Sequence, residues 1–317
     1  MKISRRTTLG AAFAATAFGL TACTTGDEAV KPRTTKIESI GLMVQDMSNP
    51  FFAAMEKGAQ DAARELGANL NVQDAQLDLA EQYNQIDNFI LQGVDLIVIS
   101  AIDSEGIAPA ITRAQNNGAI VIAVDSAADG ADATVMTDAV EAGEISARYL
   151  FEQMGGAGRI LIVDGTPLQT IRDRVTGCMN VLEEFPDIEI AGHQSSNNDR
   201  ASGLTVTTDM LTSAPDVTGI WAMNDPSALG AVLAVEQAGL TDQIIVTGID
   251  GSPEAVEELK RPTTPFIGFA TQDPAEMVRQ GVKAAQDIVA GNPPSEPTIL
   301  ISSELYTHET IDTYEGW

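Results

Sequence analysis

The chain has 317 residues, 44% of them hydrophobic, which is enough for two ordinary domains of globular composition. It carries 18 Lys and Arg against 45 Asp and Glu, a formal net charge of -27. A surface of this charge repels phosphate backbones, so nucleic acid is excluded as an expected partner.

The first 23 residues have the pattern of an export signal. Arg5 and Arg6 form a twin arginine, an apolar run follows over residues 9–20, and small residues precede Cys23 as in a lipobox. At about 12 residues the run is shorter than the ~20 that cross a membrane. We therefore expect an exported protein, free in the periplasm or held at the outer face of the cytoplasmic membrane by a lipid on Cys23. Residues 24–36 would be a flexible tether.

The first structural unit is a buried strand that runs into a capped helix. Residues 37–44 are mostly apolar and rich in strand-forming residues, and Asn49 followed by Pro50 predicts a helix start. Apolar residues then recur at three- and four-residue spacing until Gly67 ends the helix. The polar residues after the strand, beginning with Gln45, lie at its carboxyl end, where open α/β sheets bind ligands.

The same unit repeats along the chain with a period of roughly 25 to 30 residues, as βαβ crossovers require. The pattern predicts an α/β fold with two Rossmann-like lobes, each a doubly wound parallel sheet. Further strands are expected at residues 70–73, 95–99, 119–124, 133–136, 159–163, 188–191, 218–223, 244–249, 266–270 and 298–302. Further helices are expected at residues 79–92, 107–117, 139–154, 169–184, 199–211, 226–238, 253–260 and 273–290.

Hydrogen-bonding side chains stand at almost every strand end. They include Gln45, Ser100, Asp125, Ser126, Asn224, Asp250 and Gln272. Facing edges of this kind could surround a polyhydroxylated molecule. Turn and cap roles would explain single Asp, Asn and Ser residues equally well, but they do not account for Gln45 or Gln272.

Three motifs give the chain a family resemblance. They are Asn-Pro-Phe-Phe at 49–52, Ala-Met-Asn-Asp at 222–225 and Gly-Ile-Asp-Gly at 248–251. Over residues 37–304 the sequence resembles the type I periplasmic sugar-binding proteins, the ribose-binding class of ABC-transporter solute receptors. The resemblance implies a hinged pair of lobes that the chain crosses three times, with the ligand in the cleft between them. The lobes would be residues 37–138 with 273–300, and residues 139–272 with 301–317.

The resemblance also implies ligand-binding roles. It makes Asn49 a hydrogen-bonding residue, Phe51 and Phe52 the apolar walls, Asp125 the acceptor of two ligand hydroxyls and Arg172 the arginine of the cleft. Asn224, Asp250 and Gln272 would be contacts of the second lobe and hinge, and Gln45, Ser100, Ser126 and Asn198 complete the candidate site. Carboxylates accept from hydroxyls, a guanidinium donates to oxygens and aromatic faces cover C–H groups.

Four positions depart from the ribose class. Ser126 stands where that class has a second arginine and Ser100 where it has asparagine, while Asn198 and Ile249 replace aromatic residues. With fewer aromatic walls and one fewer cation, we expect another sugar or polyol as the ligand.

Other chemistries lack a pattern in the sequence. His193 and His308 have no spaced partner for a metal, and the glycines at 155–158 precede a strand, whereas a dinucleotide fingerprint follows one. There is no Gly-x-Ser-x-Gly elbow. We therefore expect no cofactor, no metal site and no catalytic residues. Cys178 would be the only cysteine left after Cys23, so no internal disulfide is expected, and its helical neighbours predict that it is buried.

The leading hypothesis is a monomeric binding protein that captures a sugar or polyol and delivers it to the permease of an ABC importer. A receptor that hands its closed state to a membrane sensor is the main alternative, and a secreted enzyme is a third. A repressor would need a DNA-binding helix-turn-helix where the export signal stands.

Overall fold

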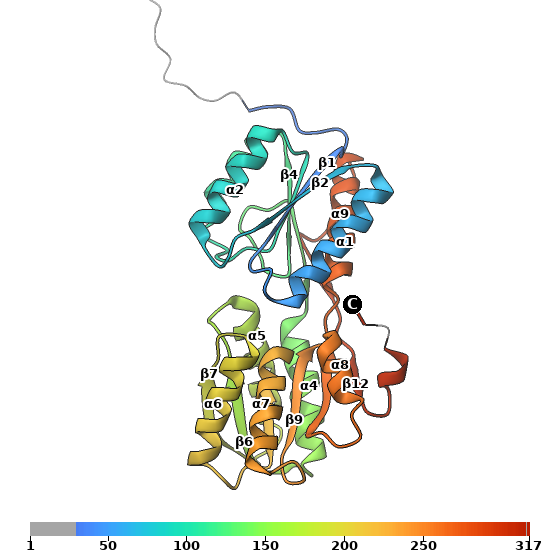
Figure 1. Cartoon of the computed structure of the whole chain (residues 1–317). Coiled ribbons are helices and arrows are strands. Elements are labelled where there is room, and N and C mark those ends of the chain that lie inside the picture. Colours follow the sequence, from blue (N-terminus) through green and yellow to red (C-terminus); the bar gives the residue numbers. More distant parts are fainter. Residues whose placement is uncertain (1–29, 315) are drawn as a thin grey trace, which may run out of the picture.

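The structure is a computed structural model that describes residues 30–314, 316 and 317. The export signal and Cys23 lie outside the described residues, so both stay predictions. The described chain forms two lobes, each a six-stranded sheet with helices on both faces (Figure 1). The predicted two-lobed α/β architecture is confirmed.

The sheet of the first lobe is parallel, with strand order β11-β5-β4-β3-β1-β2. Its strands are β1 (Ser39–Val44), β2 (Asn69–Asp74), β3 (Leu96–Ile99), β4 (Ile120–Val124), β5 (Ala133–Thr137) and β11 (Thr298–Ile301). Its helices are α1 (Pro50–Leu66), α2 (Leu79–Gln92), α3 (Ala108–Asn116) and α9 (Pro274–Val289). Side chains alternate across β1: Leu42 joins the core under α1 and α9, and Met43 joins the core under α2 and α3.

The sheet of the second lobe has the corresponding order β12-β10-β9-β8-β6-β7. Its strands are β6 (Ala157–Asp164), β7 (Asp187–Ser195), β8 (Gly219–Ala222), β9 (Ile245–Asp250), β10 (Phe266–Thr271) and β12 (Leu305–Thr307). Its helices are α4 (Ala139–Gln153), α5 (Gln169–Leu182), α6 (Arg200–Ser213), α7 (Asp225–Ala238), α8 (Pro253–Leu259) and the 3-10 turn η1 (Ile311–Thr313). β12 pairs antiparallel with β10, and the sequence pattern did not predict it.

The helix starts follow from local capping chemistry. The Asn49 side chain accepts from the backbone N–H of Phe51 at 3.0 Å, Pro50 begins α1, and Gly67 ends the helix at φ 66°. Asn224, Ser252 and four aspartates cap other helices in the same way. Because each helix follows a strand, these caps place polar side chains at the carboxyl edges of both sheets.

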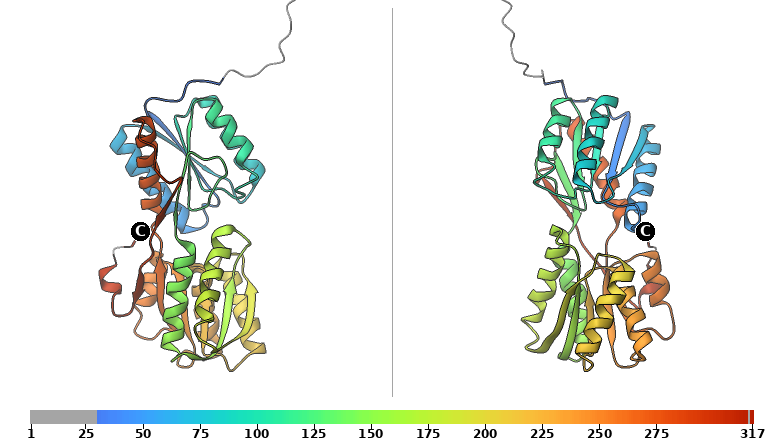
Figure 2. Two further views of the ribbon diagram at one scale, coloured as in Figure 1. Left: turned by 180° about the vertical axis from the view of Figure 1, so that it is seen from behind. Right: turned by 60° about the vertical axis from the view of Figure 1, so that its left-hand side comes forward.

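Within residues 30–314 the chain passes between the lobes at three places, after β5, after β10 and after β11 (Figures 1 and 2). Because the chain returns to the first lobe after β10, α9 packs beside α1 although the two helices are far apart in the sequence. Ser303 helps to hold the crossings together, because its hydroxyl donates to the carbonyl of Thr271 at 2.8 Å.

Part of the expected tether is attached to the first lobe. The N–H of Lys31 donates to the carbonyl of Asn116 at 2.7 Å, and Arg33 pairs with Asp132 at 2.7 Å. The sequence did not show this because backbone donors and an exposed arginine carry no periodic pattern. Any free tether would thus be shorter than residues 24–36.

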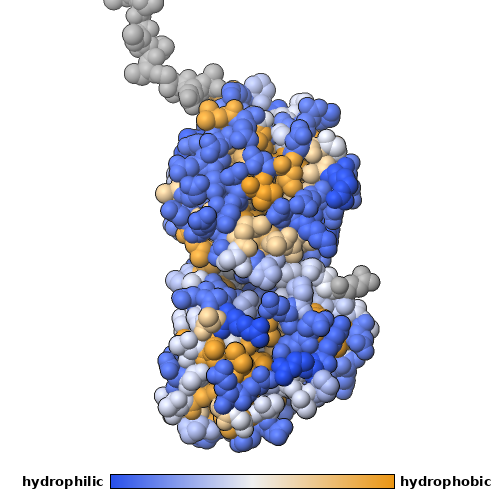
Figure 3. All heavy atoms as spheres, viewed as in Figure 1, coloured by the Kyte–Doolittle hydropathy of each residue, from blue (hydrophilic) through white to orange (hydrophobic). Residues whose placement is uncertain are grey.

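Apolar side chains form the cores of the two lobes. Cys178 is fully buried in the second lobe, as expected, and so is Trp221. On the face shown in Figure 3, hydrophilic residues cover most of both lobes and hydrophobic residues gather in limited areas. Among the described residues, no helix combines the length and apolarity needed to cross a membrane.

Candidate binding site

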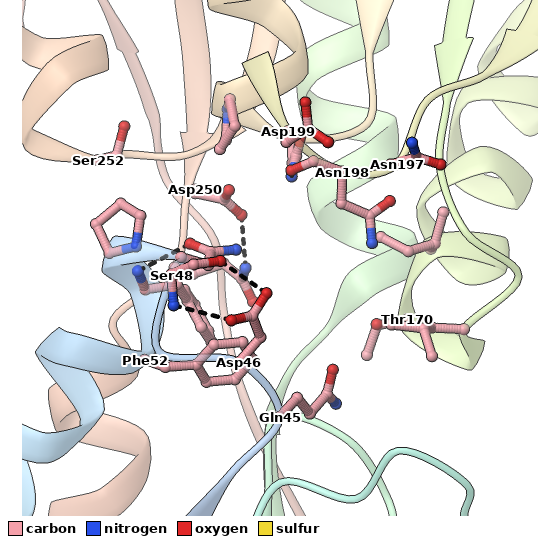
Figure 4. Close-up of a pocket in the computed structure, with 18 of the residues that line it drawn as sticks. Gln45, Asp46, Ser48, Phe52, Thr170, Asn197, Asn198, Asp199, Asp250 and Ser252 are labelled. Carbon is pink, nitrogen blue, oxygen red and sulfur yellow. Dashed lines mark hydrogen bonds between the residues drawn. The ribbon is translucent and has the colours of Figure 1, made fainter. Parts of the chain in front are cut away.

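A cavity of about 470 Å³ opens between the carboxyl edges of the two sheets. Figure 4 shows Gln45, Asp46, Ser48 and Phe52 on the first lobe, opposite residues of the second lobe such as Asn198 and Asp250. Of the predicted site residues, the lining includes Gln45, Asn49, Phe51, Phe52, Asp125, Asn198, Asn224, Asp250 and Gln272. Residues that are distant in the chain thus meet at one place.

The first lobe contributes a buried polar network. The Gln45 amide nitrogen donates to the hydroxyls of Ser100 at 3.1 Å and Ser126 at 3.0 Å. Ser100 in turn donates to the Asp125 carboxylate at 3.1 Å, and Ser126 lies 3.4 Å from the same oxygen. Neither serine belongs to the cavity lining, so both act behind Gln45 and Asp125 and hold them in place.

The second lobe contributes a buried ion pair. The Arg174 guanidinium lies 3.1 Å from the Asp250 carboxylate, and both side chains are more than nine-tenths buried. Arg174 also donates to the carbonyl of Met223 at 2.7 Å, while Gln272 donates to Asp250 at 2.8 Å. The Nε of Arg174 is buried without a hydrogen-bond partner, and Arg174 is one of the residues that line the cavity.

The structure corrects the predicted arginine. Arg172 is exposed, does not line the cavity, and is bonded to the carbonyl of Pro167 and, at 2.7 Å, to the Gln169 side chain. Two residues along a helix point to opposite sides, so only one arginine of the Arg-Asp-Arg run can face inward. Arg174 shares its buried face with Ile171 and Cys178, at three- and four-residue spacing, and it is the arginine of the cavity.

Burial makes two carboxyl groups of the cavity, Asp125 and Asp250, harder to ionise. Burial raises the pKa of Asp125 from 3.8 to about 6, although the positive charge of Arg174 and the Ser100 hydrogen bond lower it in part. Burial also raises the pKa of Asp250, again offset by Arg174. Behind Asp250, burial and the Asp250 charge raise the pKa of Asp225 well above its ordinary value.

The two buried carboxylates of the cavity, Asp125 and Asp250, have unusual backbone conformations. Asp125 has φ 63° and Asp250 has φ 138°, values that side-chain-bearing residues rarely adopt. Asp125 follows β4 and Asp250 is the last residue of β9, and these two strands occupy the same position in their sheets. Strain of this kind persists only where the surroundings impose it, and it concentrates at ligand sites.

Comparison with known proteins agrees with this geometry. Residues 40–293 match the family described as Periplasmic binding protein domain. The chain belongs to the periplasmic binding protein family. Because relatives and solved neighbours of this family are sugar-binding proteins, the predicted resemblance to its type I sugar-binding members is confirmed.

Three relatives of this binding protein cover most of its length. The ribose import binding protein of Bacillus subtilis is 31% identical over 80% of this chain and 82% of its own. The xylitol-binding protein of Mycolicibacterium smegmatis is 30% identical over 98% of this chain and 88% of its own. A solute-binding protein from Actinobacillus succinogenes, solved with bound D-allose, superimposes with a TM-score of 0.83 at 29% identity, covering 90% of this chain and 100% of that one. A solute-binding role follows from this membership.

Several site residues of this binding protein are also helix caps. Asn224 accepts from the N–H of Ser227 at 3.0 Å and donates to the carbonyl of Asn198 at 3.1 Å. The Asn198 amide is itself engaged with Thr166, through 2.7 and 2.9 Å bonds. Cap and cavity roles therefore coincide, whereas Gln45 and Gln272 cap no helix.

Apolar side chains form the remaining walls of this binding protein's cavity. Phe51 and Phe52 meet edge to face, with ring centroids 5.4 Å apart. The structure adds apolar residues that the sequence analysis missed: Leu77, Leu168, Ile171, Pro226 and Leu229. It also adds the polar residues Asp46, Ser48, Thr170, Arg174, Asn197, Asp199, Arg200, Ser252 and Glu254. Strand-end and cap positions signalled Asp46, Asp199 and Ser252, but nothing in the sequence marked the leucines.

His193, His308 and Cys178 do not line the cavity. No cluster of three or more His, Cys, Asp or Glu side chains in the described part of the chain is arranged to hold a metal. His193 lies 3.1 Å from Asp164 at the surface, and burial raises the pKa of the Cys178 thiol.

Proposed function

We propose that this binding protein captures a sugar or polyol between its lobes and delivers it to the permease of an ABC importer. The observation that carries the proposal is the cavity itself, where a buried Arg174–Asp250 pair and Asp125 face apolar walls. Charged groups that are already desolvated and oriented can exchange hydrogen bonds with hydroxyls without much further cost.

The chemistry of the lining favours a neutral polyhydroxylated ligand. Asp125 and Asp250 supply acceptors, Arg174 supplies donors, and Phe51 and Phe52 supply apolar area against C–H groups. Relatives that bind ribose, xylitol and D-allose support this class. Serines at 100 and 126, in place of the asparagine and second arginine of the ribose class, favour a sugar or polyol other than ribose.

We further propose that residues 37–138 with 273–301, and residues 139–272 with 302–317, move as two bodies that close on the ligand. The boundary lies one residue beyond the predicted one, because β11 of the first lobe ends at Ile301. Closure is a population shift whose extent depends on the ligand's preference for the closed state. We propose a monomer, exported by the signal at residues 1–23 and either free in the periplasm or anchored through Cys23. Binding and release, with no chemical change to the ligand, is the proposed activity.

A thermal-shift screen tests the proposal. The chain from residue 24 is heated with pentoses, hexoses, sugar alcohols and inositols, with amino acids as controls. Stabilisation follows RT ln(1 + [L]/Kd), so a ligand at 1,000 times its Kd adds about 4 kcal/mol. A response only to amino acids would overturn the proposed ligand class and leave the family assignment intact.

A further inference from the structure

The C-terminal segment returns to the junction of the two lobes. This segment, defined as residues 308–317 without residue 315, follows β12 and includes η1. The chain end marked C lies beside the junction in Figures 1 and 2. The segment also lies beyond residues 40–293, which the family match covers.

Two side chains of this segment hold the turn that presents Asp250. The Tyr314 hydroxyl donates to the carbonyl of Gly251 at 2.9 Å, and the Trp317 indole N–H donates to the carbonyl of Asp250 at 3.0 Å. Both residues of this turn have a positive φ, 138° at Asp250 and 83° at Gly251. The fit is close, because a Cβ on Gly251 would lie 2.3 Å from the Tyr314 oxygen. Backbone of this kind requires external support.

The same Trp317 also reaches the first lobe. Its ring meets the ring of Phe51 edge to face, with centroids 5.9 Å apart and planes at 87°, and it packs against the core under α1 and α9. Phe51 is a wall of the cavity, and Asp250 is a buried carboxylate that the second lobe contributes to it. One side chain therefore contacts a cavity residue of each lobe.

We propose that Trp317 is a positioning residue of the binding site, which sets where Phe51 stands relative to Asp250. A change in the angle between the lobes must change the distance between the Phe51 ring and the Asp250 carbonyl. Trp317 can keep both contacts over only part of that range, so it biases the lobes toward those arrangements. The effect of Trp317 on ligand affinity rests on the proposed function. Its effect on the arrangement of the lobes in the ligand-free protein does not.

The binding test uses D-ribose, xylitol, D-allose and myo-inositol at millimolar concentration with the full chain. For each probe that binds the unaltered protein, Trp317→Ala is expected to raise Kd at least tenfold. Trp317→Phe, which keeps a ring but lacks the N–H, should recover part of that loss. His308→Gln, an exposed change in the same segment, is the control and should leave Kd unchanged. A Kd within twofold for Trp317→Ala would overturn the proposal.

A second measurement needs no ligand. Amide hydrogen exchange in Trp317→Ala should quicken at residues 250–252 and around Phe51, and stay unchanged at residues 207–213 of α6, which form no part of the cavity lining. Unchanged exchange at both contact regions would overturn the proposal. If no probe binds the unaltered protein, the proposed ligand class fails, while exchange still decides the role of Trp317.

Acrylamide quenching adds a spectroscopic readout. The chain has two tryptophans, and Trp221 is fully buried, so the quencher reaches chiefly Trp317. A bound probe should change the quenching of the unaltered protein and should have almost no such effect in Trp317→Phe. Equal quenching with and without a bound probe would contradict a role for Trp317 at the moving junction.

Discussion

Arg174 carries a buried positive charge that is paired with the Asp250 carboxylate. Its guanidinium bonds Asp250 and the carbonyl of Met223 in a region closed to solvent. Arg174→Ala would leave a buried carboxylate unpaired, so we expect the free energy of unfolding to fall by about 3–5 kcal/mol. Ligand affinity should fall by about 2 kcal/mol or more, since the cavity loses its buried donor.

The neighbouring arginine gives a matched control for that change. Arg172→Ala removes the same side chain two positions earlier, at the surface, and should change stability by less than about 0.5 kcal/mol. Urea unfolding and calorimetric titration of both variants measure the difference. Equal losses of affinity would contradict the placement of Arg174 in the site.

Asp125 links pH to stability. Its pKa is 3.8 in the unfolded chain and about 6 in the folded protein, so the folded state binds the proton more tightly. Below about pH 3.8 the carboxyl group is protonated in both states, so burying it carries no charge penalty. Above about pH 6 it is ionised in both states, and folding carries the full free-energy cost of burying the charge. Stability contributed by this residue is therefore lost as pH rises from about 4 to about 6, by roughly 3 kcal/mol.

Asp125→Asn tests this linkage. The amide carries no charge and asparagine tolerates a positive φ, so the variant should be more stable than the unaltered protein at pH 7 and similar at pH 4. Its ligand affinity should fall, because an amide offers one acceptor oxygen in place of two. Thermal unfolding at the two pH values measures the first effect. Equal stability at pH 7 would show that the carboxylate is not costly to bury.

At the scale of elements, α4 and α5 touch through their backbones. A Cβ on Gly143 in α4 would lie 2.1 Å from the carbonyl oxygen of Arg174 in α5. Gly143→Ala must push α5 away and displace Arg174, so we expect a loss of at least about 2 kcal/mol despite the better helix propensity of alanine. Gln153→Ala, on an exposed site of the same helix, is the control, and urea unfolding measures both. A neutral Gly143→Ala would mean that the helices can separate freely.

Most of these elements could be predicted from the sequence, because caps and apolar periodicity are local signals. The sequence also placed Gln45, Asp125 and Asp250 at strand ends, which was enough to bring them into one cavity. The choice of Arg172 was wrong although the signal existed, since the inward spacing of Ile171 and Cys178 selects Arg174. The contacts of Trp317 could not be predicted, because Asp250 lies 67 residues away and Phe51 near the other end of the described chain, and no repeating pattern marks either contact.

At the scale of the whole molecule, the charge of -27 acts against the compact state. Like charges spread over both lobes repel each other, and salt screens them over a Debye length of about 10 Å at 0.1 M. We expect sodium chloride between 0.05 and 1 M to raise the free energy of unfolding by about 1 kcal/mol, or ~2–4 °C in melting temperature. Thermal unfolding at increasing salt measures the shift. A falling melting temperature would indicate that attractive ion pairs dominate.

The position of α9 and β11 determines the order in which the lobes can be completed during synthesis. α9 supplies Met277, Val278 and Val282 to the core of the first lobe, and β11 pairs with β5. The lobe that begins the chain therefore keeps part of its apolar core uncovered until residue 301 has been made. All of the second lobe's parallel strands are synthesised before that point. Although nascent chains usually fold from the N-terminal domain onward, this one is expected to complete its second lobe's parallel sheet first.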